Sequence, residues 1–97
     1  MIGFYLVGRI TEEPEKTESA NGLLICRLKL SVDRTIKGQE NSPEIFEVVV
    51  FKNLAEDKYE VGQLLAISGR VQANNFEKEG TTYYHANLIG NSVDFIS

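Results

Sequence analysis

Residues 64–76, with the sequence LLAISGRVQANNF, decide which fold the chain is predicted to adopt. The stretch opens as a continuous apolar run, which is typical of a strand that is buried on both faces. The pattern changes at Gly69, where we expect the strand to bend, and beyond it the residues alternate, with Val71 and Ala73 on an apolar face. A period of two places four other side chains in a row on the opposite face: Arg70, Gln72, Asn74 and Phe76. A cation, amides and an aromatic ring suit contact with phosphates and bases, although an ordinary half-solvated strand face carries the same residues.

The composition is that of one globular domain covering residues 1–97. Apolar residues make up 42% of the chain and charged residues 25%, which are ordinary values for a soluble protein. The sequence shows neither an apolar run of about 20 residues that could span a membrane nor a signal peptide. The one cysteine, Cys26, excludes an internal disulfide, and one histidine is too few for a zinc site. We therefore expect a cytoplasmic protein without membrane contact.

The net charge of −4 argues against a nucleic-acid binder, because such domains are usually basic. The charges are segregated along the chain, however. Residues 12–18 hold four acids and one lysine, whereas residues 23–38 hold four cations and one acid. The four cations are Arg27, Lys29, Arg34 and Lys37. A basic surface is therefore compatible with the acidic total.

The N-terminal part of the chain predicts one strand and one connection. Residues 4–10 are a compact run of strand formers that includes Gly8, and a glycine inside a strand often marks a bulge or a close approach of two backbones. Residues 11–22 lack helical periodicity and end in Asn21-Gly22, the dipeptide most typical of a tight hairpin turn. We expect a connection that ends in a turn there.

The clearest strand covers residues 24–32, in which apolar and polar side chains alternate. Cys26 lies on the apolar face. Arg27 and Lys29 make the other face basic, and solvation of an open sheet face is the commonest role of such residues. Residues 34–43 are polar and predict a long hairpin loop that carries two cations.

Residues 44–52 predict the next strand. Phe46 would face inward, whereas Val49 and Phe51 would face outward beside the basic face of the preceding strand. Apolar side chains on the outside of a sheet suggest either a covering element or a surface made for contact.

Residues 53–62, with the sequence NLAEDKYEVG, form the one plausible helix, which is barely two turns long. Asn53 would cap this helix, with Glu56 as the partner in a capping box, and Gly62 would end it. The helix falls between the third and fourth predicted strands.

The remaining segments complete an all-β pattern. After residues 64–76 the chain turns at Gly80, residues 81–89 return as a strand, and residues 92–96 form a short closing strand. A small antiparallel sheet of this length would leave long apolar edges unless it closed on itself. The order strand, strand, strand, helix, strand, strand is that of the five-stranded antiparallel OB-fold barrel, in which a short helix fills the open end between strands 3 and 4. An SH3-like barrel or a small sandwich is the alternative, but neither expects a helix there.

The chain offers little for catalysis. His85 is the only histidine, and Cys26 lies on an apolar strand face, so a structural role is expected for both. The acids lack the spacing of a catalytic pair, and no glycine-rich phosphate loop is present. We expect a protein that is not an enzyme and that needs no cofactor and no metal.

The sequence resembles the bacterial and phage single-stranded DNA-binding proteins of the OB-fold type. The resemblance covers nearly the whole chain and rests on the order and spacing of five segments: FYLVGRIT, ANGLLICRLKLSVDR, EIFEVVVFKNLAE, VGQLLAISGRVQANNF and SVDFI. In that family, aromatic residues at the ends of two strands stack on bases, and those positions are Phe51 and Phe76 here. The resemblance also implies a homo-oligomer, a dimer or a tetramer, formed through the first strand or a sheet face.

Some features depart from the family pattern. Ile45 stands where a further stacking aromatic is typical, tryptophan is absent, and the helix after NLAE is short. The sequence also ends at Ser97 without the flexible linker and acidic tip through which many members recruit partners. In these features the chain is similar to primosomal replication protein B and to the small accessory DNA-binding proteins of phages and mobile elements.

The combined prediction is sequence-independent binding of single-stranded DNA in replication, recombination or repair. Stacking is assigned to the two phenylalanines, and contact with phosphates or bases to the rest of the candidate set: Arg27, Lys29, Arg34, Lys37, Phe51, Lys52, Arg70, Gln72, Asn74, Phe76 and Lys78. Tyr83 or Tyr84 can contribute, but strand parity does not decide which of them faces outward. The alternative is a protein-interaction OB module or an accessory to a helicase or primosome. In that case Val49 and Phe51 dock onto a partner, and DNA binding is weak or absent.

Overall fold

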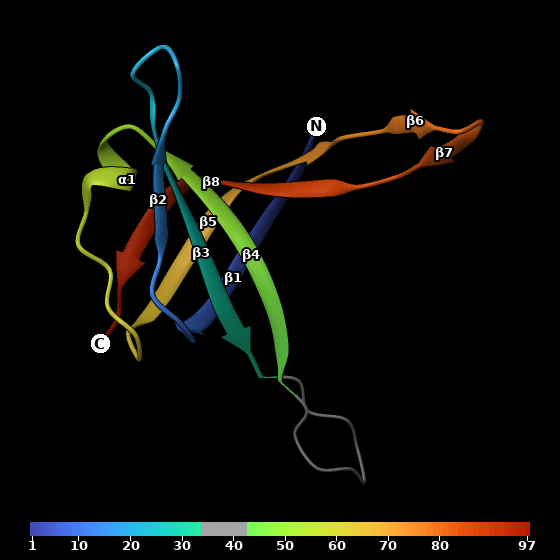
Figure 1. Cartoon of the computed structure of the whole chain (residues 1–97). Helices are drawn as coiled ribbons and strands as arrows, with labels where there is room; N and C mark the ends of the chain where they lie inside the picture. The colour runs from blue at the N-terminus through green and yellow to red at the C-terminus, as the bar shows by residue number, and fades with distance from the viewer. Residues whose placement is uncertain (34–42) are drawn as a thin grey trace, which may run out of the picture.

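The computed structural model describes residues 1–33 and 43–97 of the chain (Figure 1). The elements along these residues are β1 (Ile2–Ile10), β2 (Glu15–Glu18), β3 (Leu24–Val32), β4 (Glu44–Phe51), α1 (Asn53–Glu56), β5 (Leu64–Ala73), β6 (Phe76–Lys78), β7 (Thr81–Tyr83) and β8 (Ala86–Phe95). The hairpin loop predicted over residues 34–43 falls almost wholly outside the described residues.

Within these residues five strands close into a barrel, in the order β1-β5-β8-β4-β3 and back to β1. The barrel closes where Arg9 pairs with Ser31 and Ile10 pairs with Leu30. Neighbouring strands run antiparallel, except that β4 and β8 run parallel. β2 extends the sheet beyond β3, and α1 lies between β4 and β5, the third and fourth barrel strands. The predicted five-stranded barrel with one short helix at this point of the chain is confirmed.

The core consists of side chains that alternate along the barrel strands. The largest fully buried side chains are Ile10, Cys26, Leu28, Leu30, Val48, Val50, Leu65 and Ile67. Burying one aliphatic side chain of this size stabilises a fold by about 1.5–3 kcal/mol. The alternation predicted for residues 24–32 is therefore confirmed, and it leaves Arg27 and Lys29 on the outside of the barrel.

The helix is shorter than predicted. α1 ends at Glu56, and the next residue, Asp57, has an extended backbone with φ −61° and ψ 151°. The cap predicted at Asn53 is wrong, because the N-cap is Lys52 at φ 55° and no described side chain caps the helix. Nor is any helix among the described residues long and apolar enough to cross a membrane.

Tyr59 explains why the helix ends early. Its ring is buried and stacks on Phe95, with the ring centroids 5.6 Å apart. Its hydroxyl donates a hydrogen bond to the Leu54 carbonyl oxygen at 2.6 Å. The extended backbone from Asp57 onward lets this ring reach the end of the barrel. Gly62 does not end the helix but forms a separate turn, at φ 93°, before β5.

Several strands begin or end at residues other than those predicted, because their ends depend on the strands with which they pair. The strand predicted over residues 64–76 is divided between β5 and β6, and β6 pairs with β7 in a hairpin that projects from the barrel (Figure 1). The strand predicted over residues 81–89 is divided between β7 and β8. β8 is held by β5 and β4, and it therefore continues through Gly90-Asn91 and includes most of the closing strand predicted over residues 92–96. Residues 11–22, predicted as a connection, contain β2.

Two predictions about backbone geometry are confirmed. The chain turns at Asn21-Gly22, where Gly22 has φ 82° and the Ser19 amide donates to the Leu23 carbonyl oxygen at 2.8 Å. Gly8 marks a close approach of β1 and β3, because a Cβ atom there would lie 3.0 Å from the Ser31 carbonyl oxygen.

Gly69 is required by the close approach of β5 and β8. A Cβ atom at this position would lie 1.8 Å from the Ile89 carbonyl oxygen. The register between the strands shifts by one residue here, so that Asn91 of β8 is left out of the pairing. Such a bulge bends a strand. The bend predicted at Gly69 therefore exists, and it is shared with β8.

We predict that Gly69→Ala destabilises the fold by about 3 kcal/mol or more, because the clash is with backbone that is itself paired. Chemical denaturation followed by circular dichroism measures this loss. Gly3→Ala is the control, since its Cβ would lie 3.3 Å from the nearest atom, the Gly69 carbonyl oxygen. The control should change the free energy of unfolding by less than about 1 kcal/mol. Equal stability of the two variants would contradict the requirement for glycine at position 69.

Candidate nucleic-acid interface

One row of side chains crosses the outer face of four barrel strands. Arg27 of β3 pairs with Val49 of β4, which in turn pairs with Ile89 of β8. Ile89 also pairs with Arg70 of β5. Paired residues of neighbouring strands point to the same side of a sheet. The two arginines therefore stand at opposite ends of a row whose centre is apolar.

Further side chains flank this row on the same face. Phe51 lies two residues beyond Val49 on β4, and Glu47 lies two residues before it. Gln72 of β5 pairs with Asn87 of β8 beside them. The outward direction predicted for Val49 and Phe51 is confirmed, and both side chains are half-buried rather than bare. The face therefore combines apolar, amide and charged groups.

On this face of the described structure, three shallow hollows join into one groove, called the outer groove below. The central hollow, of about 240 Å³, is lined in part by Val49, Phe51 and Ile89. Phe51 and Ile89 also line a hollow of about 400 Å³ toward α1. Glu47, Val49 and Asn87 line both the central hollow and one of about 440 Å³ toward the base of the β6–β7 hairpin. The shared residues make the groove continuous across the barrel.

The cations of β3 are paired with acids. Lys29 Nζ lies 2.9 Å from Glu12 Oε1, and this hydrogen bond raises the pKa of Lys29 above its ordinary value. Arg27 Nη1 lies 3.8 Å from Glu47 Oε1. All four side chains are about half-exposed, and ion pairs in such positions are weak and screened by salt. The face predicted to be basic therefore carries cations whose charge is compensated.

Two predicted cations lie at the α1 side of the outer groove. Arg70 and Lys52 both line the hollow toward α1, and both are exposed. Arg70 Nη1 donates a hydrogen bond to Gln72 Oε1 at 3.2 Å, which joins two of the predicted site residues. Within the described part of the chain, neither cation forms a salt bridge.

The β6–β7 hairpin carries the other aromatic candidate. Phe76 pairs with Tyr83, and their rings stack with centroids 5.3 Å apart and an angle of 18° between the planes. Every residue of β6 and β7 is exposed, including Lys78. Tyr84 is exposed as well, at 80%. Phe76 therefore lies on a projecting hairpin and not in the row that crosses the barrel.

One more predicted site residue, Asn74, lies apart from the outer groove. Asn74 stands between β5 and β6, where its backbone amide donates to the His85 carbonyl oxygen at 2.7 Å, and its side chain is exposed. Arg34 and Lys37 lie outside the described residues.

Neither Ile89 nor Glu47 was assigned to the candidate site from the sequence, and the choice between Tyr83 and Tyr84 was left open. Ile89 was hidden because the bulge in β8 changes the alternation there, and no local pattern shows a bulge. Glu47 could have been found, since strand parity alone places it outward beside the cations of β3. The choice of Tyr83 could have been made by counting outward from the turn at Gly80, which sets Tyr83 opposite Phe76.

Cys26 carries no site chemistry. Its side chain is fully buried, and burial raises the pKa of the thiol, an effect that nearby Lys16 only partly offsets. A protonated thiol is a poor nucleophile. Among the described residues, no group of three or more His, Cys, Asp or Glu side chains could hold a metal ion.

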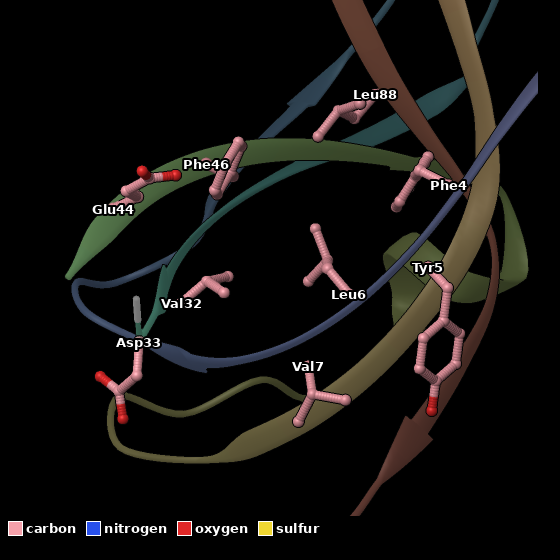
Figure 2. Close-up of a pocket in the computed structure, with 9 residues that line it drawn as sticks. All are labelled: Phe4, Tyr5, Leu6, Val7, Val32, Asp33, Glu44, Phe46 and Leu88. Carbon is pink, nitrogen blue, oxygen red and sulfur yellow. The ribbon is translucent and has the colours of Figure 1, made fainter. Parts of the chain in front are cut away.

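A larger hollow, of about 720 Å³, lies between β1 and β4 and adjoins one end of the outer groove, because Phe46 and Leu88 also line the hollow toward the β6–β7 hairpin. Figure 2 shows Leu6, Val32 and Phe46 directed into this space. Phe46 therefore lies on the inner side of β4, as predicted, but 37% of it is exposed because the barrel is open at this end. The charged side chains that line the hollow among the described residues are Asp33 and Glu44. A lining with acids and without cations does not suit a phosphate.

The comparison with known proteins decides the family. The sequence matches the Single-strand binding protein family over residues 1–96. The chain belongs to this family. The single-stranded DNA-binding protein 1 of Staphylococcus aureus is 35% identical over 97 residues, covering 94% of this chain and 62% of that protein. The chain thus spans less than two thirds of the length of this curated relative.

Two solved structures of single-stranded DNA-binding proteins are similar to this one. A deletion mutant of the single-stranded DNA binding protein from Thermus aquaticus has a TM-score of 0.81 and 26% identity, covering 100% of this chain and 51% of that chain. The small single-stranded DNA-binding protein from Streptomyces coelicolor has a TM-score of 0.72 and 21% identity, covering 97% and 93%. The second likeness shows the fold alone. The family resemblance and the OB-fold barrel expected from the sequence are both confirmed.

Proposed function

We propose that this protein binds single-stranded DNA with little regard to sequence and acts in DNA replication, recombination or repair. The observation that carries the proposal is the outer groove of a single-strand binding family member, where an apolar floor and Phe51 lie between Arg27 and Arg70. Stacking on aromatic rings combined with charge contacts to phosphates is how proteins bind single strands without reading their sequence. The protein would act by binding alone and not as an enzyme.

Base stacking is assigned to two places. Phe51 lies at the junction of two hollows of the outer groove, so a base in the groove contacts its ring. Phe76 already stacks on Tyr83, and a base on the free face of Phe76 would continue this stack. Each stacked base contributes about 1–3 kcal/mol. Tyr83 packs against the other face of the Phe76 ring.

Phosphate contacts are assigned to cations around both places. Arg27 and Arg70 end the central row, Lys52 stands toward α1, and Lys78 lies on the hairpin. The remaining members of the proposed set are Lys29, Arg34, Lys37, Gln72 and Asn74. Because Arg27 and Lys29 are paired with acids, a phosphate has to compete for them. A modest affinity follows from this competition.

The alternative, a protein-interaction module without DNA binding, is not favoured by the family relationship. That alternative was suggested by the outward-facing side chains of Val49 and Phe51. Both side chains lie in the outer groove, where a base can cover them. Partners among replication or primosome proteins, a single domain over residues 1–97 and a cytoplasmic location stay predictions from the sequence.

Self-association through β1 is part of the proposal. β1 pairs with β3 only at Arg9 and Ile10, so one edge of residues 2–8 is left unpaired within the described structure. On this strand Tyr5 is 71% exposed and Val7 39%. An unpaired edge is a template for another strand, and a second copy offers the same edge about a two-fold axis. A dimer, or a tetramer of two dimers, would cover it.

Titration of labelled oligo(dT) at several salt concentrations tests DNA binding. Fluorescence anisotropy should show binding at low salt that weakens steeply as salt is added. The reason is that lysine and arginine side chains in contact with phosphates release the counterions held there. Four phosphate contacts would give a slope of log K against log salt of about −3. A duplex of the same length is the control and should bind less well. Absence of binding to oligo(dT) at low salt would overturn the proposed function.

The two stacking places are tested by Phe51→Ala and Phe76→Ala. Each variant should weaken oligo(dT) binding by roughly 5- to 150-fold while its circular dichroism spectrum stays that of the parent. Phe95→Leu is the control, because Phe95 is 47% exposed, close to the 49% of Phe76, but lies away from the outer groove. An unchanged affinity for either alanine variant would remove that ring from the interface. A changed spectrum would assign it to the core instead.

The double variant Tyr5→Glu, Val7→Glu tests self-association. Light scattering coupled to gel filtration should give the mass of an oligomer for the parent and of a monomer for the variant, because like charges would meet across the two-fold axis. Val61→Glu is the control, since Val61 is an exposed apolar residue outside β1 and its replacement should leave the mass unchanged. A monomeric parent, or a double variant that keeps the parent's mass, would overturn the β1 interface.

A further inference from the structure

Lys52 has a backbone conformation that costs stability. Its dihedral angles are φ 55° and ψ −124°. A residue that carries a Cβ atom is tolerated at positive φ mainly where ψ is roughly +30° to +60°, so Lys52 lies outside the favoured regions. Such a conformation persists only where the surrounding structure fixes it, and outliers of this kind concentrate at functional sites.

Three backbone hydrogen bonds hold residue 52 in this conformation. The Lys52 amide donates to the Leu24 carbonyl oxygen at 3.1 Å, which ties the end of β4 to the start of β3. The Lys52 carbonyl oxygen accepts from the amides of Ala55 at 3.0 Å and Glu56 at 3.2 Å, both of which belong to α1. The fold therefore dictates the angles at residue 52 whatever its side chain. A glycine would adopt them at a lower cost.

The side chain of Lys52 lines the outer groove beside a second cation. With Arg70 it lines the hollow toward α1, whose apolar lining includes Leu23, Phe51 and Leu54. Both cations are exposed, and neither is part of a salt bridge with another described residue. The described lining of this hollow holds no acid. It therefore offers an apolar surface to a base and two uncompensated charges to the adjoining phosphate.

Arg27, the cation at the other end of the row that crosses the barrel, is compensated. Its Nη1 lies 3.8 Å from Glu47 Oε1, and both side chains line the central hollow. A phosphate that approaches them meets opposite charges, so the attraction of one is largely offset by the repulsion of the other. The net positive charge that a strand meets along the described groove is therefore concentrated in the hollow toward α1.

We propose that the hollow toward α1 is the main phosphate subsite of the outer groove, and that Lys52 exchanges fold stability for its phosphate contact there. The inference deepens the proposed function and rests on it, because the ligand is the same single strand. Lys52 and Arg70 hold the phosphate, and the neighbouring base covers Phe51. A glycine at residue 52 would suit the backbone better, but it would leave Arg70 as the one cation in the described lining of this subsite.

The salt dependence of oligo(dT) binding, measured by fluorescence anisotropy, tests the subsite. Each phosphate contact with a single strand contributes about 0.7 to the slope of log K against log salt. Lys52→Gln and Arg70→Gln should each make the slope shallower by about this amount. The double variant Arg27→Gln, Glu47→Gln removes a compensated pair, so it should change the slope by less than about half as much.

Lys58→Gln is the control for loss of a positive charge. Lys58 has a side chain that is 88% exposed and does not line the outer groove, so this variant should leave the slope unchanged. The subsite is overturned if the double variant changes the slope as much as Arg70→Gln does. It is equally overturned if Lys52→Gln has no more effect than Lys58→Gln.

Lys52→Gly tests the exchange of stability for binding. Thermal unfolding followed by circular dichroism should show a midpoint raised by about 4 °C or more, because glycine relieves the strain. The same variant should lose as much of the salt slope as Lys52→Gln. Lys52→Gln keeps a Cβ atom, so its midpoint should stay close to that of the parent.

A midpoint for Lys52→Gly that is no higher than the parent's would overturn the exchange, because residue 52 would then carry no strain that glycine relieves. The midpoint is measured without DNA, so it separates this failure from that of the proposed function. If the parent does not bind oligo(dT) at low salt, the proposed function itself is wrong.

Discussion

The close contact between β5 and β8 at Gly69 is the constraint on which the rest of the barrel depends. The Ile89 carbonyl oxygen occupies the space that a Cβ atom would need at Gly69, and the extra residue Asn91 forms a bulge beside it. Gly90 is confined on the inner side, where a Cβ would lie 2.9 Å from Val50 Cγ1. This crowding lets one continuous strand pair with β5 on one side and with β4 on the other. The same bend sets Ile89 between Val49 and Arg70, so the constraint that closes the barrel also builds the floor of the outer groove.

The sequence predicted those parts of the fold in which burial alone decides the conformation. Residues 24–32 alternate because one side of β3 faces the core and the other faces solvent, and that side-chain pattern is visible without knowing any neighbour. The turn at Gly22 and the bend at Gly69 were also predictable, since each needs a residue without a Cβ. What could not be predicted depends on partners distant in sequence. β2 is fully exposed and exists because β3 lies beside it, and β8 is continuous because two strands hold it. The helix ends at Glu56 because Tyr59 is needed in the core.

The candidate site follows the same division. Parity correctly placed Val49, Phe51 and the cations of β3 on one outer face, because that inference needs only local alternation. It could not give the compensation of Arg27 and Lys29 by Glu47 and Glu12, since an ion pair depends on which strands are neighbours. A count of cations along the chain therefore overstates the basic character of the surface. Two of the chain's acids, Glu12 and Glu47, lie next to the residues that were expected to bind phosphate.

The two stacking places differ in how they are held, and this difference bears on how each contributes to binding. Phe51 is fixed by β4, whose alternate residues Val48 and Val50 are fully buried, so its ring is in position before a strand arrives. Phe76 lies on a three-residue strand in a separate two-stranded sheet, all of it exposed. A two-stranded hairpin alone is marginally stable in water, and the stacking of Phe76 on Tyr83 is the side-chain contact that orders it. A base proposed to stack on Phe76 would meet a marginally stable hairpin, whereas a base on Phe51 would meet a ring held by the barrel. In the proposed interface the outer groove would therefore supply the preformed part, and the hairpin would add an aromatic contact that depends on the Phe76–Tyr83 ring pair.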